Sequence, residues 1–326
     1  MNFLRVTITR MIYAALLLVA VLILNFTLMH LAPGDVADTI AQSAGGIDPE
    51  ALEQIRQEYG LDKPFIIQLG SYIGRVLQFD LGYSFFYSQP VTDLILDRLP
   101  ATLLLVISAQ LLALVIGVVF GVISARKPNG IFSHFVTLAS LIGYSAPVFW
   151  TGLLMLVMFS LILPWFPVAG MRDVTIENGN IFIHTVDVAR HLVLPMVTLA
   201  SIFVALYSRL SRASMIEVLG SDYVRTAKAK GLKTRQVVYK HALKNAISPV
   251  ITLAGLQLSA IVSGAVLVET VFSWPGLGTL AFQSIIARDT PAILGILFFS
   301  SLVVIVGNLV TDLALRLVDP RVGSKK

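Results

Sequence analysis

The segment Asp222-Tyr-Val-Arg-Thr-Ala-Lys-Ala-Lys-Gly-Leu232, which continues to His241-Ala-Leu-Lys244, lies between two long apolar stretches of the chain. Nine Lys and Arg residues fall between Arg209 and Lys244. A glycine separates two short runs of residues that favour helices. The pattern therefore predicts a basic helical hairpin over residues 215–247.

Each helix of this hairpin has candidate start and stop signals. Ser221 or Asp222 can cap the first helix, and Gly231 is placed to end it in a left-handed conformation. Thr234 can cap the second helix. The first helix is too short to be stable alone in water, where about 12 to 15 residues are needed, so it must rest on another surface.

Small and large side chains alternate along the first helix in a way that suits a docking surface. Ala227 and Ala229 leave a shallow face that the groove of a partner can approach closely. Tyr223 and Leu232 offer larger anchors at the two ends. We expect this helix to contact another protein.

The whole chain is too apolar for a soluble domain. Of its 326 residues, 56% are hydrophobic and 13% are charged, whereas soluble domains carry about 25% charged residues. A spanning helix needs roughly 20 apolar residues to cross about 30 Å of hydrocarbon. Six such stretches predict an all-α membrane protein with six transmembrane helices, near residues 8–31, 99–125, 131–163, 191–210, 250–272 and 292–317.

Proline interrupts the third predicted span, and a pair of glycines marks the second. Pro147 lies near the middle of the third, where it removes a helical hydrogen bond and kinks the chain. The freed carbonyl must face protein or a water-filled cavity, so the break can line a pathway or serve ordinary helix packing. Gly117 and Gly121 in the second span predict close packing against another helix.

The distribution of charge predicts an orientation. Connecting segments on one side of the membrane, including both termini and the hairpin, hold 17 of the 24 Lys and Arg residues. By the positive-inside rule that side is the cytoplasm. The other side holds 15 of the 19 acidic residues. The basic excess is thus a topology signal and gives no support for a nucleic-acid partner.

The N-terminal apolar stretch is expected to be a retained span. From Met11 to Leu31 it is longer than the roughly 7 to 15 apolar residues of a signal peptide, and Ala32-Pro-Gly-Asp35 lacks a clean cleavage pattern. The chain contains no cysteine, so it has no thiol nucleophile and no thiolate metal ligand.

Two short helices are predicted between the first and second spans. Residues 48–60 begin with a capping Asp and a Pro at the first helical position and end at a glycine. Phe65 to Leu77 carries apolar residues at helical spacing. This outer layer can be a scaffold, or it can receive a soluble protein that delivers a substrate.

A family resemblance rests on motifs spread over the chain. Arg225-Thr-Ala-Lys-Ala-Lys-Gly231, followed by His241-Ala-Leu-Lys244, resembles the signature of permease subunits of ATP-binding-cassette (ABC) importers. The general signature reads Glu-Ala-Ala, three residues, Gly, nine residues, Ile-x-Leu-Pro. Here Ala227, Gly231 and Leu243 match, while Arg225, Thr226, His241 and Lys244 replace Glu, Ala, Ile and Pro.

Flanking motifs strengthen the resemblance to the first of the two permease subunits in the dipeptide, oligopeptide and nickel branch. They are Met29-His-Leu-Ala-Pro-Gly-Asp35, Tyr59-Gly-Leu-Asp-Lys-Pro64, Asp80-Leu-Gly-Tyr-Ser84, Asp222-Tyr-Val-Arg-Thr-Ala227, Glu269-x-Val-Phe-Ser-Trp-Pro-Gly-Leu-Gly278 and Val318-Asp-Pro-Arg321.

This resemblance implies a type I importer permease in a bacterial inner membrane. Residues 1–98 would form the first span and an outer helical segment, residues 99–318 the permease core, and residues 319–326 a cytoplasmic tail. The expected partners are a homologous second permease, two cytoplasmic ABC ATPase subunits and an extracytoplasmic substrate-binding protein. ATP and Mg would be bound by the ATPases, since this chain has no phosphate-binding loop motif.

The hairpin would then be the element that couples the permease to the ATPases. Asp222 and Arg225 are expected to make polar docking contacts, Tyr223, Ala227 and Leu232 to pack in a groove, and Gly231 to form the turn. The full set of candidate coupling residues is Asp222, Tyr223, Arg225, Thr226, Ala227, Lys228, Gly231, Leu232, His241 and Leu243.

Catalysis by this chain is not expected. Its five histidines are scattered and are predicted to be interfacial or packing residues, with no ligand spacing to carboxylates and no metal site. No span carries a nucleophile with a Lys, His or Asp partner. Asp312, which lies within a span, is expected to pair with Arg316 one turn later.

An ion-coupled secondary transporter is the alternative function, although the spans show neither a cluster of charges at mid-membrane nor an internal repeat. Di- or oligopeptides are the first substrate hypothesis, with nickel complexes, glutathione, opines and sugars as alternatives. Polar or kink residues that could line a pathway are Gln110, Tyr144, Pro147, Gln257 and Asn308.

Overall fold

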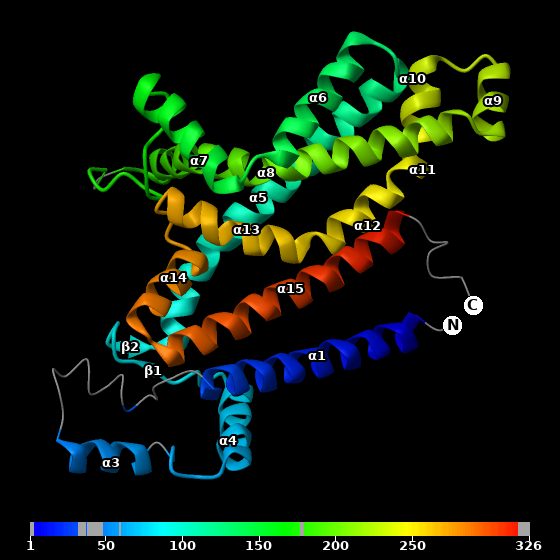
Figure 1. Cartoon of the computed structure of the whole chain (residues 1–326). Helices are drawn as coiled ribbons and strands as arrows, with labels where there is room; N and C mark the ends of the chain where they lie inside the picture. Colours follow the sequence, from blue (N-terminus) through cyan, green and yellow to red (C-terminus); the bar gives the residue numbers. More distant parts are fainter. Residues whose placement is uncertain (1–2, 32–36, 38–47, 59, 177–178, 319–326) are drawn as a thin grey trace. The chain divides into compact units, whose positions relative to one another are not determined.

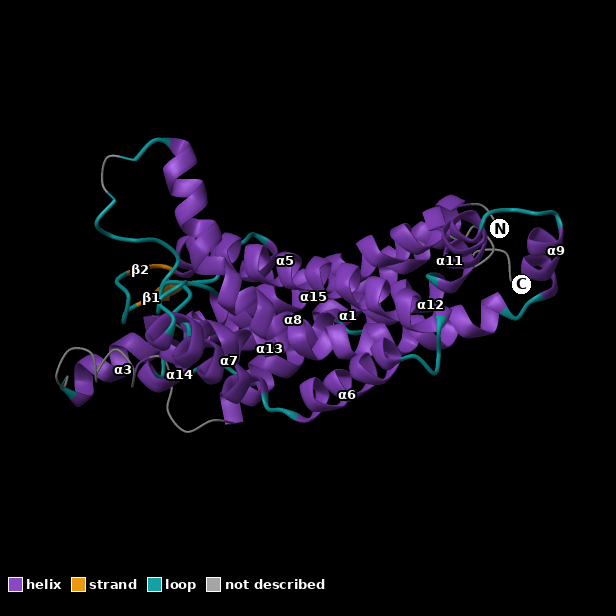
Figure 2. Ribbon diagram, turned by 90° about the horizontal axis from the view of Figure 1, so that it is seen from above, coloured by secondary structure: helices purple, strands orange, loops and turns teal. Residues whose placement is uncertain are grey.

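The computed structural model describes residues 3–31, 37, 48–58, 60–176 and 179–318. Most of the Met29–Asp35 motif, Tyr59 and the tail 319–326 therefore lie outside the described residues, as do the side chains of the expected Asp312–Arg316 pair. Helices dominate the described secondary structure (Figures 1 and 2). The chain divides into two compact units, one of residues Met1–Thr102 with Pro275–Ile305 and one of Leu103–Trp274 with Val306–Lys326.

The first unit contains the N-terminal helices, a small strand hairpin and the first parts of two long helices. Its elements are α1 (Phe3–Leu31), α3 (Pro49–Glu58), α4 (Phe65–Leu77), β1 (Tyr83–Ser84), β2 (Gln89–Pro90), α14 (Leu277–Ala287) and the first parts of α5 (Val91–Arg126) and α15 (Thr290–Val318). The two strands pair antiparallel, with Tyr83 opposite Pro90 and Ser84 opposite Gln89.

Both short helices predicted between the first and second spans are present. α3 begins at Pro49, with the Asp48 carboxylate accepting a hydrogen bond from the Glu50 amide at 3.4 Å, and Gly60 has a φ of +66°. α4 has the predicted bounds Phe65–Leu77. α14 was not predicted, because its 11 residues are too few to span a membrane.

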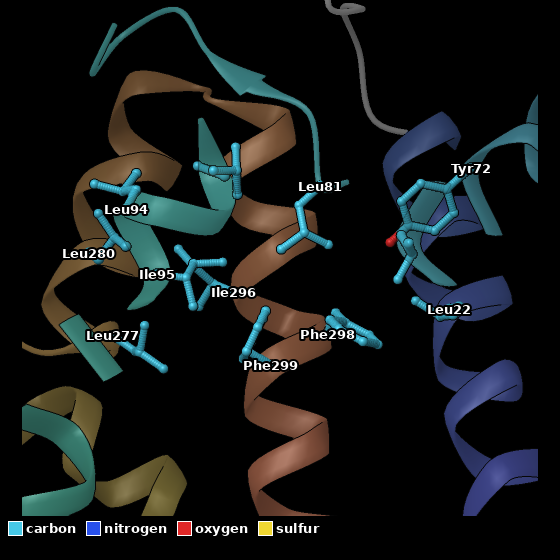
Figure 3. Close-up of a cluster of buried hydrophobic side chains, with 13 residues drawn as sticks. Leu22, Tyr72, Leu81, Leu94, Ile95, Leu277, Leu280, Ile296, Phe298 and Phe299 are labelled. Carbon is cyan, nitrogen blue, oxygen red and sulfur yellow. The ribbon is translucent and has the colours of Figure 1, made fainter. Parts of the chain in front are cut away.

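An apolar cluster forms the core of the first unit (Figure 3). It joins Leu22 of α1 and Tyr72 of α4 to side chains of α5, α14 and α15, among them Ile95, Leu280 and Phe299. Burial raises the pKa of the Tyr72 phenol to about 12. This desolvated hydroxyl stays neutral at physiological pH, so Tyr72 acts as part of the apolar core.

A buried carboxylate fixes the start of α15. One oxygen of Asp289 accepts a hydrogen bond from the Ala292 amide at 3.3 Å, and the other accepts one from the Ser84 hydroxyl. The Ser84 oxygen in turn accepts a bond from the Tyr87 amide at 3.0 Å. Asp289 is an N-cap that ties the strand hairpin to this helix, and its role was not predicted from the sequence.

The second unit contains the remaining helices. They are the rest of α5 and α15, α6 (Ile131–Ser145), α7 (Val148–Leu156), η1 (Val157–Ile162), α8 (Ile181–Leu219), α9 (Asp222–Ala229), α10 (Thr234–Gln236), η2 (Val237–Ala242), α11 (Leu243–Ala246), α12 (Ser248–Leu256) and α13 (Leu258–Val271). η1 and η2 are π-helical turns.

Four described helices are long and apolar enough to cross a membrane, or up to six if each of two bent pairs counts as one span. The third predicted span is a bent pair, since the chain turns by 105° at Ala146 and Pro147 between α6 and α7. The fifth is also bent, by 54° at Gln257. The break predicted at Pro147 is therefore confirmed, whereas the bend at Gln257 was not predicted.

Two other predicted spans are longer in the structure. α8 starts at Ile181 and not near His191, because the Asn180 side chain caps it by accepting a hydrogen bond from the Ile183 amide at 3.0 Å. α5 starts at Val91. Apolar runs locate the membrane-spanning part of a helix and leave out its polar extensions.

Candidate functional site

The hairpin rests on an apolar cluster of its own chain. Val224 and Ala227 of α9 are 0% and 7% exposed. They pack with side chains of α5, α8 and the second hairpin helix, which consists of α10, η2 and α11. These side chains are Val122, Ala125, Met215, Val237, Val238, Ala242 and Ala246. This burial supplies the support that the short helix needs. Ala227 was thus wrongly predicted to face the groove of a partner.

Other predicted contact residues on α9, which lies near one end of α8 (Figure 1), and on the turn after it are exposed. Tyr223 is 45% exposed and Leu232 is 37% exposed. Ala229 and Lys228 are exposed as well. One side of α9 is therefore anchored in the chain, while the other offers two large apolar side chains and basic groups to the surroundings.

Gly231 ends α9 in the predicted left-handed conformation, with a φ of +74°. The Gly231 amide donates to the Lys228 carbonyl at 3.0 Å, and the Leu232 amide donates to the Ala227 carbonyl at 3.4 Å. This pair of bonds is a Schellman motif. A Cβ atom at Gly231 would have nothing within 4 Å, so the requirement for glycine is conformational and not steric.

The predicted caps are only partly right. Ser221 occupies the N-cap position of α9, but its hydroxyl donates back to the Val218 carbonyl at 2.6 Å and does not cap the helix. Thr234 is the first helical residue of α10, and Lys233 takes the cap position. Both departures arise because a hydroxyl can also bond to a nearby backbone carbonyl. The local path of the backbone decides which partner is within reach.

Polar groups on the exposed side of α9 are paired within the hairpin. Arg225 lies 3.4 Å from the Asp222 carboxylate, and both side chains are exposed. The Thr226 hydroxyl donates to the Asp222 carbonyl at 2.9 Å. An exposed pair of this kind adds little stability, so Asp222 and Arg225 remain available for contacts outside the chain.

Asn245 joins the two helices of the hairpin and was missed in the sequence. Its side-chain amide donates to the Tyr223 hydroxyl at 2.7 Å, and it lies 3.5 Å from the His241 carbonyl. His241 itself is half-buried, and Leu243 packs against the apolar cluster. His241 and Leu243 therefore belong to the base of the hairpin and not to its exposed side.

The predicted pathway residues do not come together as one site. Gln110 of α5 donates to the Tyr207 hydroxyl of α8 at 3.2 Å and to the Ala254 carbonyl of α12 at 3.3 Å. Tyr144 is exposed and lies next to the break at Pro147. Gln257 is at the α12–α13 bend, and Asn308 is exposed on α15. Gln110 thus links three helices, whereas the other residues lie at bends or on an open surface.

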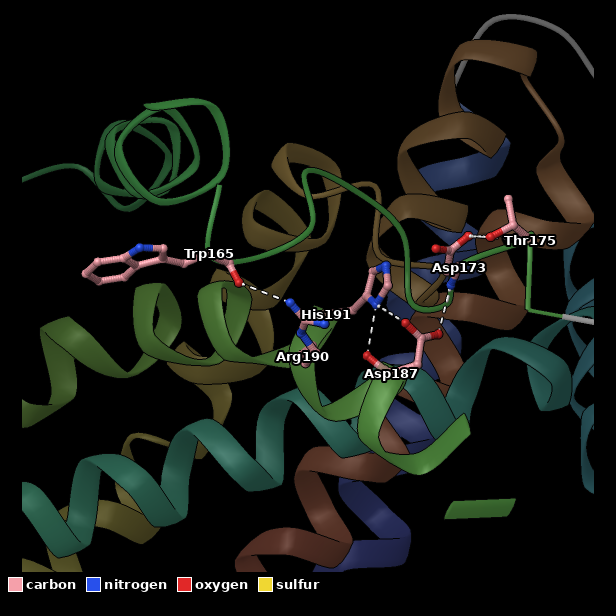
Figure 4. Close-up of polar contacts among 6 residues, drawn as sticks. All are labelled: Trp165, Asp173, Thr175, Asp187, Arg190 and His191. Atoms are coloured by element: carbon pink, nitrogen blue, oxygen red, sulfur yellow. Dashed lines mark hydrogen bonds and ion pairs between the residues drawn. The ribbon is translucent and has the colours of Figure 1, made fainter. Parts of the chain in front are cut away.

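A loop between η1 and α8 is tied to the first turns of α8 (Figure 4). The Asp187 carboxylate accepts a hydrogen bond from the Asp173 amide at 2.8 Å and lies 3.1 Å from Nδ1 of His191. Arg190 approaches the Trp165 carbonyl at 3.5 Å. This pairing of His191 with a carboxylate four residues earlier was not predicted from the sequence.

The same loop contains a carboxylate with a shifted pKa. The Thr175 amide and hydroxyl donate to Asp173 Oδ1 at 2.9 and 2.7 Å. These bonds lower the pKa of the Asp173 carboxyl below its ordinary value, with a smaller contribution from His191. The described residues contain no group of three or more His, Asp or Glu side chains that could hold a metal ion.

Comparisons with known proteins identify the family. Residues 117–324 match the family described as binding-protein-dependent transport system inner membrane component, and residues 3–106 match its N-terminal companion. The chain belongs to this family. It is a permease subunit of a binding-protein-dependent ABC importer.

Several relatives of this permease are named for peptide transport. The oligopeptide transport system permease protein AppB of Bacillus subtilis (strain 168) is 40% identical, with 94% of this chain and 95% of that protein covered. The di/tripeptide transport system permease protein DppB of Pseudomonas aeruginosa (strain UCBPP-PA14) is also 40% identical, with 93% and 94% covered.

A solved ABC importer shares the fold. The inward-facing MetNI methionine ABC transporter matches with a TM-score of 0.55 and 18% identity, over 69% of this chain and 96% of that one. At this identity the likeness concerns the fold alone. Family membership decides against the ion-coupled secondary transporter that the sequence left open.

Proposed function

We propose that this permease transports di- or oligopeptides. Relatives of 38 to 40% identity that cover more than 90% of the chain are named for oligopeptides, di/tripeptides and dipeptides. The substrate therefore follows from the relatives alone, and it calls for a direct uptake measurement.

We also propose that the hairpin transmits the ATPase cycle to the spans. The observation that carries this proposal is the two-sided burial of α9 and the turn after it, in which Val224 and Ala227 are anchored in the chain while Tyr223 and Leu232 are exposed. A short helix fixed to α5 and α8 moves with them. Force applied by a partner at its exposed side would therefore tilt long helices.

The remaining partners follow from the importer class. A homologous second permease, two cytoplasmic ABC ATPases and an extracytoplasmic substrate-binding protein complete the assembly, and the ATPases bind ATP and Mg. This chain is then a non-catalytic subunit of a bacterial inner membrane, with both termini and the hairpin in the cytoplasm. Residues 1–98 form the N-terminal part and residues 99–318 the permease core, with the coupling hairpin at 215–247 and a tail at 319–326.

The free energy needed to switch the conformation of the importer supports coupling through more than one hairpin. Moving a conformational equilibrium from 1:99 to 99:1 takes about 5.5 kcal/mol of differential binding. One helix of eight residues with two exposed apolar anchors is too small a contact for that. We therefore expect the second permease to contribute a matching hairpin.

Single cysteines can test the docking and the orientation, because the native chain has none. Tyr223→Cys and Leu232→Cys should cross-link to a co-expressed ATPase subunit. Val174→Cys is the matched control, since Val174 is 90% exposed but lies on the opposite, outer loop in this proposal. A membrane-impermeant maleimide should label Val174→Cys in intact cells and Lys230→Cys only in permeabilised cells. Labelling of Lys230→Cys in intact cells would refute the orientation.

Uptake into proteoliposomes tests the substrate. Vesicles holding the complete complex and its binding protein should accumulate a labelled dipeptide only with ATP. Excess unlabelled peptides should compete, whereas nickel complexes, glutathione, opines and sugars should not. ATP-dependent uptake of one of the latter, without peptide uptake, would replace the substrate and keep the transporter class.

A further inference from the structure

A basic pocket lies where α5 ends beside the second hairpin helix. It is lined by Arg126, the last residue of α5, and by Arg235, Val238 and Tyr239 of α10 and η2, and its volume is about 670 Å³. That volume lies within the range of about 300 to 1,000 Å³ of small-ligand sites. None of these four residues belongs to the set predicted for coupling or for the pathway.

The two guanidinium groups lack anionic partners. Among the described residues, the side chains of Arg126 and Arg235 form no hydrogen bond or ion pair, and no acidic side chain lines the pocket. The nearby Arg212 differs, because it donates to the Pro128 carbonyl at 3.1 Å and to the Ser133 hydroxyl at 3.0 Å. Arg212 thus holds the turn that follows α5, while the two pocket arginines are free to bind an anion.

The chemistry of the lining favours a phosphate group. Guanidinium groups match phosphate oxygens with paired hydrogen bonds, and two of them can hold one phosphate from different sides. Tyr239 adds a hydroxyl donor, and the buried Val238 supplies an apolar wall. Only two acidic residues, Glu217 and Asp222, occur between Leu210 and Ile247, so the local potential attracts anions.

An apolar stripe on α5 leads to the pocket. Val115, Val119 and Ile123 are 61%, 46% and 39% exposed and follow one another at intervals of four residues. Residues at this spacing share a helix face, which continues to Arg126. From Val115 to Arg126 the helix rises about 16 Å, close to half of the roughly 30 Å hydrocarbon core. A lipid chain lying along this stripe would place its headgroup at Arg126.

We propose that the pocket of Arg126, Arg235, Val238 and Tyr239 binds the phosphate headgroup of an anionic phospholipid whose acyl chain lies along Val115, Val119 and Ile123. Basic pockets at the ends of transmembrane helices are suited to such headgroups. A lipid held there bridges a membrane span and the second helix of the hairpin. It would restrict the movement of the hairpin relative to α5.

Native mass spectrometry of the purified importer complex, with phosphatidylglycerol or phosphatidylcholine added in mixed micelles, tests this proposal. We expect one saturable phosphatidylglycerol site, weakened about tenfold in the double variant Arg126→Gln and Arg235→Gln. The variant Arg126→Lys and Arg235→Lys keeps the charge, loses the paired bonds and should fall in between. The matched control Lys127→Gln with Lys233→Gln removes two neighbouring charges outside the pocket and should change the affinity by less than about twofold.

Three results would overturn the proposal. Equal binding of phosphatidylcholine would show that the anionic phosphate headgroup is not selected. Displacement by inorganic phosphate would identify a site for soluble anions. Retention of the lipid by the isolated permease but not by the complex with its ATPases would assign the pocket to an acidic segment of the partner. A monodisperse elution profile for every variant keeps a folding defect apart from these outcomes.

Discussion

Gly117 of α5 lies directly against Tyr207 of α8, so that a Cβ atom added at Gly117 would come within 2.6 Å of the Tyr207 Cβ. Four residues later, a Cβ atom at Gly121 would lie 2.8 Å from the backbone nitrogen of Arg212. The small residues therefore allow two spans to approach at backbone distance, as their spacing predicts. This seam lies between the Gln110 network and the hairpin on the same two helices.

Substitution of Gly121 should damage this seam. Gly121→Val places a branched side chain against backbone that cannot move away, so we expect a loss of about 1 to 3 kcal/mol or more and a lower melting temperature in detergent. Gly74→Ala on α4 is the control, since a Cβ there has nothing within 4 Å. It should be neutral or stabilising by up to about 1 kcal/mol. Equal melting temperatures for Gly121→Val and the native protein would contradict close packing.

Gly231 should matter for coupling more than for assembly. Gly231→Val forces a β-branched residue into positive φ, a penalty of about 1 to 2 kcal/mol that reshapes the end of α9. The variant should insert and assemble in part but hydrolyse ATP with less uptake per ATP. Gly231→Asn, which tolerates this conformation better, should retain more coupling. The measurement is the ratio of uptake to hydrolysis in proteoliposomes, and an unchanged ratio in Gly231→Val would remove the turn from the mechanism.

The Gln110–Tyr207 hydrogen bond should be measurable by a double-mutant cycle. Gln110→Leu and Tyr207→Phe each remove one partner, so the double variant should lose less stability than the sum of the two. We expect a coupling energy of about 0.5 to 1.5 kcal/mol in SDS unfolding titrations. Zero coupling, together with altered substrate preference in Gln110→Leu, would assign Gln110 to the pathway and not to helix packing.

Asp187 should hold the outer loop against α8. Asp187→Ala leaves the Asp173 amide without its acceptor and removes the carboxylate beside the His191 ring, which keeps its bond to the backbone carbonyl of residue 187. We expect a local cost of about 1 to 3 kcal/mol. Amide hydrogen exchange in residues 165–176 should become faster, while exchange in α13 should not change. Asp187→Asn keeps an oxygen acceptor for the Asp173 amide and should show an intermediate rate. Native exchange rates in Asp187→Ala would mean that other contacts hold the loop.

The turn at Asp173 should respond to acid. Its folded pKa is lowered from 3.8, so its hydrogen bonds with Thr175 add stability above pH 3.8 that is lost as the pH falls through the lowered folded pKa. Thr175→Val removes the hydroxyl donor and should move loop opening to higher pH. Pepsin cleavage of the loop across a series of acidic pH values measures this shift. Thr185→Val, whose hydroxyl bonds only to the Ile181 carbonyl of its own helix, is the control.

Local signals in the sequence predicted much of the fold. Pro49 at the first turn of α3, the apolar spacing in α4 and the left-handed Gly231 each act within a few residues, and the structure confirms all three. The same reasoning from neighbouring residues gave the wrong helix-capping roles for Ser221 and Thr234. A capping hydroxyl competes with nearby carbonyls, and the path of the backbone decides between them.

The candidate site was likewise predicted only in part from the sequence. Motif spacing indicated the hairpin and the importer class before any coordinates, and family membership bears out that class. Which residues of the hairpin face outward was not predictable, because Ala227 and Ala229 are identical in chemistry and differ only in what packs against them. Asn245, Asp187 and Asp289 were missed since their partners are set by helix register or by distant segments.

By itself, the sequence determined that this chain is an apolar helical membrane protein with a basic hairpin, because hydrophobic length, charge asymmetry and glycine conformation are properties of short segments. Only the tertiary structure decided how sharply the third apolar stretch turns at Pro147, that the fifth stretch bends, that Ala227 is buried and that Arg126 and Arg235 share a pocket. These features depend on the contacts of residues far apart in the chain, and such contacts exist only after the helices have packed.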